Sequence, residues 1–94
     1  ADEQAVQLSD TFLSPEFPYS VRAGALDVLF STDRSEESWT DRLENLLADQ
    51  DPRIRYRAVS ALQFLNSETR ERLVETRLIE EHDARVGMAL KNYR

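Results

Sequence analysis

Residues 51–62 constrain the fold most, because they carry a helix start followed by a regular apolar stripe. Asp51 can cap a helix with its side chain, and Pro52 suits the first helical position, where no backbone N–H is required. Apolar residues then recur at the spacing of one helix face, namely Ile54, Ala58, Ala61, Leu62 and Leu65. The segment indicates a helix with one buried face, and its small alanines favour close approach of neighbouring helices.

The same pattern recurs on both sides at nearly constant spacing. Residues 21–29 (VRAGALDVL) align without a gap on residues 54–62 (IRYRAVSAL), 33 positions later. Residues 83–86 (DARV) align on residues 51–54 (DPRI) at a shift of 32, with Gly87 where Arg55 would stand. Fixed-period self-similarity of this kind is the mark of a stacked helical repeat, and the third copy is degenerate.

Another amphipathic segment precedes each copy of the pattern. The repeating unit is therefore a pair of helices, of which the preceding segment is the first helix and the copy is the second. The expected buried residues of these first helices are Ala5, Leu8, Phe12 and Leu13, then Trp39, Leu43, Leu46 and Leu47, then Leu73, Val74 and Leu78. The first helix of the second repeat is expected to have Ser38 as its N-cap, with Asp41 three residues later. The first helix of the third repeat is expected to have Ser67 as its N-cap. The last helix is expected to begin at Asp83 and to bury Val86, Ala89, Leu90 and Tyr93.

This pattern resembles HEAT repeats, and its short period resembles the compact bacterial HEAT-like repeats related to phycobilin lyase subunits. The resemblance covers nearly the whole chain and is strongest in the centre. It implies an all-α fold, a right-handed α-α superhelix (solenoid) of about three antiparallel helix pairs. The expected repeats are residues 1–31, 36–66 and 67–94 of a single HEAT-like domain.

A length of 94 residues suits one small domain with a modest core. The last helix is expected to run to the final residue, and Ala1 stands where an initiator Met would be, so we expect a fragment of a longer protein. No run of about 18 apolar residues could span a membrane, and the chain is expected to be soluble. The compartment stays open, with the cytoplasm favoured over the periplasm.

The net charge of −6 disfavours nucleic acid and anionic membranes as partners, because both attract Lys and Arg. The charge is uneven along the chain. Residues 1–50 carry eleven acids and three arginines, whereas residues 51–94 carry seven acids and nine bases. We interpret most of these charges as the solvated surface of a helical repeat.

Candidate catalytic chemistry is sparse. The chain has no Cys, and its one His, His82, lies in a Glu-Glu-His-Asp sequence that reads as a solvated turn before the last helix. Two glycines within helical segments cannot form a phosphate loop. We therefore predict no catalytic, cofactor-binding or metal-binding residues, and a protein that is not an enzyme.

Three arginines in the central repeat raise the question of DNA binding, since HEAT-like DNA glycosylases hold phosphates with basic side chains. Arg53 and Arg57 fall near one another on a helix, while Arg55 lies well away from them. In HEAT families, the Arg at the positions of Arg22 and Arg55 typically joins an Asp of a neighbouring repeat in a ladder. The resemblance thus implies a structural role for Arg22 and Arg55.

If second helices line the concave side, as in HEAT solenoids, a partner would meet the positions opposite the core stripe. In the central repeat these are Tyr56, Ser60 and Gln63. The equivalent positions in the flanking copies are Ala23, Asp27 and Phe30, then Met88 and Asn92. Apolar anchors among small polar groups suit a protein or peptide partner. The alternative is that Phe30 and Met88 complete the core.

These observations predict a non-enzymatic protein–protein interaction or scaffold module, with flanking domains or repeats. One alternative is an accessory HEAT-like domain or subunit of a lyase or modification enzyme. A second alternative is a nucleic-acid-binding HEAT-like domain, which the net acidic charge disfavours.

Overall fold

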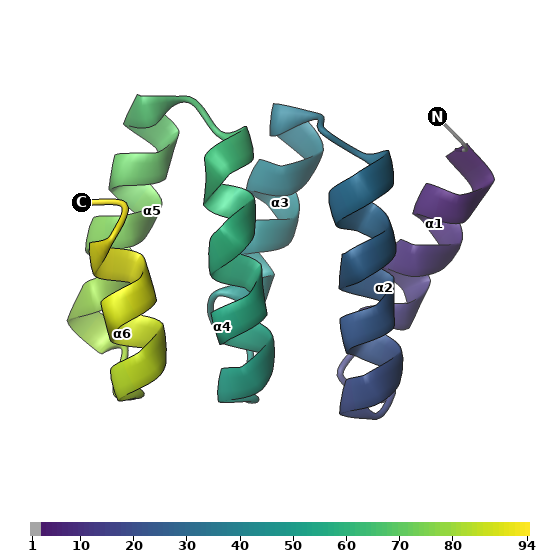
Figure 1. Ribbon diagram of the computed structural model, residues 1–94, viewed down its shortest axis with the longest axis horizontal. Coiled ribbons are helices and arrows are strands. Elements are labelled where there is room, and N and C mark those ends of the chain that lie inside the picture. The colour runs from purple at the N-terminus through teal and green to yellow at the C-terminus, as the bar shows by residue number, and fades with distance from the viewer. Residues whose placement is uncertain (1–2) are drawn as a thin grey trace. The chain divides into compact units, whose positions relative to one another are not determined.

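The computed structural model describes residues 3–94, which form six α-helices and one short 3-10 helix and contain no strand. The all-α prediction is confirmed. In chain order (Figure 1) the elements are α1 (Glu3–Phe12), α2 (Tyr19–Thr32), α3 (Glu36–Leu46), α4 (Pro52–Val59), η1 (Ser60–Phe64), α5 (Ser67–Glu80) and α6 (Ala84–Lys91). No described helix combines the length and the apolar character that crossing a membrane requires.

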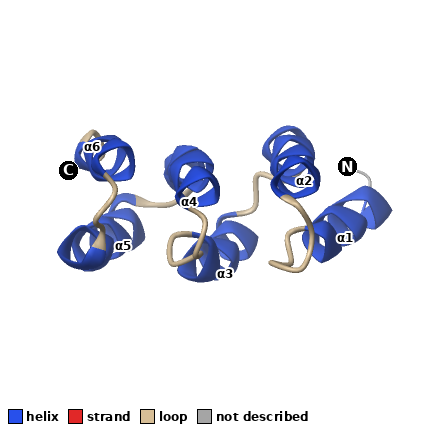
Figure 2. Cartoon of the chain, turned by 90° about the horizontal axis from the view of Figure 1, so that it is seen from below, coloured by secondary structure: helices blue, strands red, loops and turns tan. Residues whose placement is uncertain are grey.

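The chain divides into two compact units between the first and second expected repeats. Unit 1 comprises Ala1–Arg34 and unit 2 comprises Ser35–Arg94. Unit 1 holds one helix pair, α1 and α2. In unit 2, α3 and α5 form one layer and α4 and α6 form the other, as Figure 2 shows.

Unit 1 is held by contacts between its two helices and at the turn that joins them. Phe12 and Phe17 meet edge to face across this turn, with ring centroids 5.1 Å apart. Leu13 is buried as predicted, while Ala5 and Phe12 are half-buried. The prediction that Leu8 is buried was wrong, because its side chain is 58% exposed.

The core of unit 2 follows the two predicted stripes. Trp39, Leu43, Leu46 and Leu47 are buried, and so are Ile54, Ala58, Ala61, Leu62 and Leu65. Trp39 is fully buried and stacks on Phe64, with the ring centroids 5.6 Å apart. Leu73, Val74, Val86 and Leu90 complete this core, whereas Leu78, Ala89 and Tyr93 are half-buried.

Helix starts agree with the sequence in two cases and differ in two. Asp51 and Asp83 cap α4 and α6 as predicted. The cap of α3 is Ser35, whose Oγ accepts the N–H of Ser38, because Glu36 and Glu37 are favourable in a first turn and extend the helix backwards. The cap of α5 is Asn66, one residue before the predicted Ser67; its Oδ1 accepts the N–H of Thr69 at 2.8 Å.

Both second helices of unit 2 end earlier than expected. The final turns beyond Val59 tighten into η1, where the Gln63 side-chain amide donates to the Ser60 carbonyl at 2.9 Å. Leu65 is buried from an extended backbone rather than from a helix. The expectation of a helix through residue 94 was also wrong, since α6 ends at Lys91.

Candidate interaction surface

Two turns of the same construction precede α4 and α6. In the first turn, Asp49 Oδ2 accepts the N–H of Asp51 at 2.9 Å; in the second, Glu81 Oε2 accepts the N–H of Asp83 at 3.0 Å. Asp51 and Asp83 in turn accept first-turn amides of their helices, at 2.9 Å from Arg53 and Arg85. The two turns are 32 residues apart, so the sequence period of unit 2 is also a period of hydrogen bonding.

Arg55 ties α4 to the turn that begins α6. Its Nε and Nη2 each donate to a different carboxylate oxygen of Glu81, both at 2.9 Å. Its Nη1 donates to the carbonyl of Asp49 at 2.7 Å. The Glu81 side chain is only 1% exposed, so this two-point ion pair is largely removed from water. The expected ladder partner was an Asp of a neighbouring repeat, and the partner of Arg55 in unit 2 is Glu81.

The protonation equilibrium of Glu81 reflects these contacts. Burial alone raises the pKa of the Glu81 carboxyl, but the hydrogen bonds from Arg55 and from the Asp83 N–H, with the charges of Arg55 and Arg77, outweigh it. The pKa of Glu81 is therefore lowered below its ordinary value of 4.5. The carboxylate stays ionised near neutral pH and holds Arg55.

Arg22 occupies the position of Arg55 in unit 1. It is buried, and its Nε donates to the carbonyl of Leu13 at 2.8 Å. Leu13 directly follows the last residue of α1, where carbonyl groups lack partners within the helix. Arg22 thus closes the end of the first helix of its own pair, much as Arg55 reaches the carbonyl of Asp49 after α3.

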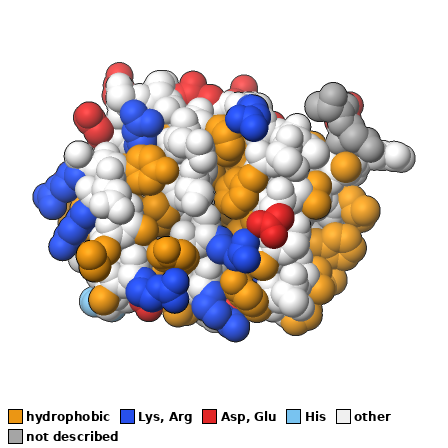
Figure 3. Space-filling view, in the orientation of Figure 1, with side chains coloured by type: hydrophobic (Ala, Val, Ile, Leu, Met, Phe, Trp, Pro, Cys, Tyr) orange, Lys and Arg blue, Asp and Glu red, His pale blue; other side chains and the backbone are white. Residues whose placement is uncertain are grey.

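The exposed side of the α4–α6 layer carries two large side chains that the core does not use. Tyr56 is 41% exposed and Met88, 32 residues later, is 69% exposed. The guanidinium of Arg85 lies over the Tyr56 ring, 4.5 Å from its centroid. Figure 3 shows Lys and Arg side chains around hydrophobic ones over α4 and α6. We call Tyr56, Arg85, Met88 and Lys91 the α4–α6 face.

The other residues predicted to bind a partner are divided between the two units. Ser60, Gln63 and Asn92 are exposed in unit 2, on or next to the elements that carry Tyr56 and Met88. Asp27 is exposed and Phe30 is half-buried, both on α2 of unit 1. The expectation that Ala23 is exposed was wrong, because this small side chain is buried.

Sequence reasoning missed Arg85 as a residue of this surface. Its signal is present, because Arg85 stands 32 residues after Arg53 and one helical turn before Met88. The two arginines nevertheless behave differently. Arg53 turns back to its own cap, with Nη2 2.9 Å from Asp51 Oδ2, whereas the Arg85 guanidinium lies over the Tyr56 ring.

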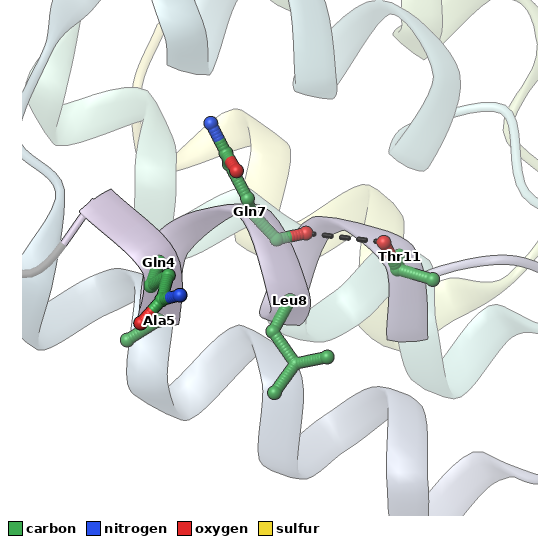
Figure 4. A pocket seen from close by; sticks show the side chains of 5 residues that line it. All are labelled: Gln4, Ala5, Gln7, Leu8 and Thr11. Carbon is green, nitrogen blue, oxygen red and sulfur yellow. Dashed lines mark hydrogen bonds between the residues drawn. The ribbon is translucent and has the colours of Figure 1, made fainter.

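A shallow open hollow also runs along α1 of unit 1 (Figure 4), lined by Gln4, Ala5, Gln7, Leu8 and Thr11. The Thr11 hydroxyl donates to the carbonyl of Gln7 at 3.1 Å, which leaves it occupied within the helix. None of the five side chains titrates near neutral pH, so the hollow offers no general acid or base. All five side chains are uncharged.

Metal-ligating side chains do not gather in the described part of the chain. Among residues 3–94, no group of three or more His, Asp or Glu side chains could hold an ion. His82 is exposed in the turn between α5 and α6, as the sequence suggested.

Comparisons with protein-family models, with curated proteins and with solved structures find no match to this chain.

Proposed function

We propose that this protein is a non-enzymatic interaction module built from HEAT-like helix pairs, and that it binds a protein partner through the α4–α6 face. The observation that carries the proposal is the exposure of Tyr56 and Met88 at equivalent positions of two adjacent second helices. Large apolar side chains on an ordered surface are the usual anchors of protein interfaces. Scattered exposed hydrophobic residues need no explanation, but two that recur with the repeat period indicate a shared use.

The HEAT-like assignment rests on the repeated geometry of unit 2. Helices α4 and α6 each begin after an Asp cap, and the backbone N–H of that Asp donates to an acidic side chain two residues earlier. Arg55 then connects one pair to the next through Glu81. Contacts between successive helix pairs are the type of interaction that stabilises a repeat array.

The function is tested by affinity capture from a lysate of the source organism, with the unaltered chain, a Met88→Glu variant and an Ile79→Glu variant. Met88 and Ile79 are both highly exposed, but Ile79 lies at the end of α5, outside the α4–α6 face. We expect a partner that the unaltered chain and Ile79→Glu retain and that Met88→Glu loses, with equal helical circular dichroism for all three. Recovery of the same proteins by all three chains would contradict the proposal.

A further inference from the structure

The two layers of unit 2 carry opposite charge. Residues 51–66 and 83–94, which form α4, η1, α6 and their caps, contain six basic and two acidic side chains. Residues 35–50 and 67–82, which form α3, α5 and the adjoining turns, contain four basic and ten acidic side chains. An acidic protein thus has one layer of net positive charge, and this layer is the one with exposed Tyr56 and Met88.

Arg85 is the most informative residue of this layer. Its equivalent in α4, Arg53, is neutralised by an ion pair, whereas Arg85 has none within residues 3–94. The Arg53 guanidinium binds both oxygens of Asp51, at 3.1 and 2.9 Å. The Arg85 guanidinium instead lies over the Tyr56 ring, and neither Arg85 nor Lys91 forms an ion pair with another residue of 3–94. A guanidinium that contacts a ring and has no ion-pair partner can still bind a carboxylate, with two parallel hydrogen bonds.

The position of Arg85 also runs against helix electrostatics. It is the second residue of α6, where the helix dipole favours acidic side chains and disfavours cations. A residue that breaks a local rule of stability is a candidate for a functional role. Lys91 lies in the last turn of the same helix, so Met88 is flanked by one cation a turn before it and another a turn after it.

We propose that the α4–α6 face binds an acidic peptide segment in which carboxylates flank a bulky apolar side chain. The apolar side chain covers Met88 and Tyr56, and the carboxylates pair with Arg85 and Lys91. This inference rests on the proposed function and names the chemistry of the partner. Nucleic acid fits less well, because one face of the Tyr56 ring is already covered by Arg85 and cannot stack on a base.

The test is selection from a phage-displayed library of random dodecapeptides on the full chain at low salt, followed by anisotropy measurements with the enriched peptides. Arg85→Glu is the principal variant, and Arg72→Glu on α5 is its matched control, with the same change in charge at another exposed Arg. Because Glu suits the first turn of a helix, Arg85→Glu is expected to fold with an unchanged or higher unfolding midpoint.

We expect enriched peptides with Asp or Glu on both sides of a large apolar residue. Arg85→Glu should weaken their binding by about tenfold, the loss expected for one charge-assisted contact, while Arg72→Glu should change it little. Enrichment of uncharged or basic peptides whose binding is lost in Met88→Ser would overturn the acidic partner and leave the proposed function standing. Failure to enrich any peptide sensitive to Met88→Ser or Arg85→Glu would remove both.

Binding of a labelled single-stranded oligonucleotide is measured in the same way, to test nucleic acid as the partner. We expect it to bind no more tightly to the unaltered chain than to Arg85→Glu. Tight binding that falls steeply with salt and is lost in Arg85→Glu would overturn the peptide proposal and assign the face to nucleic acid.

Discussion

Helix α2 of unit 1 and helix α4 of unit 2 carry the same apolar-Arg pattern but bury it to different extents. Val21 is 38% exposed, whereas its counterpart Ile54 is fully buried. Val28 is likewise exposed and its counterpart Ala61 is buried. Inside unit 2, α4 packs on α3, η1 and α6, while inside unit 1, α2 packs on α1. Conversely, α2 buries Ala23, whose counterpart Tyr56 is exposed. The repeated sequence therefore sets the helix pattern, and the elements that pack beside each helix decide which positions are buried.

The largest expected difference between the two helices is the cost of removing these equivalent side chains. Ile54→Ala should lower the free energy of unfolding by about 2–5 kcal/mol, because it leaves a cavity in a closed core. Val21→Ala should cost less than about 1 kcal/mol, because solvent already reaches the site. Urea unfolding followed by circular dichroism measures both. Equal losses would show that the burial of Ile54 contributes nothing beyond that of an exposed residue.

Arg55 gives the next effect. Arg55→Met should destabilise the protein by about 3–5 kcal/mol, because it leaves the buried Glu81 carboxylate without its partner. The double variant Arg55→Met with Glu81→Gln should recover part of this loss, since the uncompensated charge is then removed as well. If the double variant is as unstable as the sum of the two single variants, the ion pair is not the source of the effect.

The same pair predicts a pH dependence. Because the pKa of Glu81 is lowered on folding, its contribution to stability is complete above the ordinary pKa of 4.5 and is lost as the pH falls through the lower pKa of the folded state. Urea midpoints measured from pH 7 downwards should fall in this acidic range. In Glu81→Gln the decline should be shallower, and an identical decline would assign it to other carboxylates.

The sequence was sufficient for the helices and for most of the core of unit 2, because apolar spacing near 3.6 residues is a strong signal. It was less reliable at helix ends. Ser35 and Ser38 both offer a hydroxyl, and the choice depends on how the acidic first turn extends, which no periodicity shows. The burial of Val21 and Leu8 depends on which side of each helix packs on another element, and that information is absent from a local pattern.

The binding surface shows a similar limit. Tyr56 and Met88 could be proposed from their positions opposite the apolar stripe. Arg85 could not be separated from Arg53 in the same way, because both follow an Asp cap by two residues. Only the structure distinguishes the guanidinium that returns to its cap from the one that lies over a ring.

The smallest expected effect concerns the two glycines. One lies in each unit, and neither belongs to the core, so they allow a comparison of the units outside the core. Gly24 lies within α2 and Gly87 within α6, and a Cβ added at either meets no atom within 4 Å. Neither has a positive φ, so Ala fits both without backbone strain. Each Gly→Ala change should raise the free energy of unfolding by up to about 1 kcal/mol, because Gly loses more backbone entropy in a helix.

Urea unfolding of Gly24→Ala and Gly87→Ala checks this, and a fall in stability would mean that the added methyl group is not accommodated. The pair also sharpens the comparison of the two units, because Gly87 directly precedes Met88 whereas Gly24 lies in unit 1. Peptide binding that is weakened in Gly87→Ala but unchanged in Gly24→Ala would mean that the partner approaches the backbone of α6 closely, using the open space above Gly87. Unchanged binding in both would limit the contact to side chains, and the two glycines would then represent unused stability in both units.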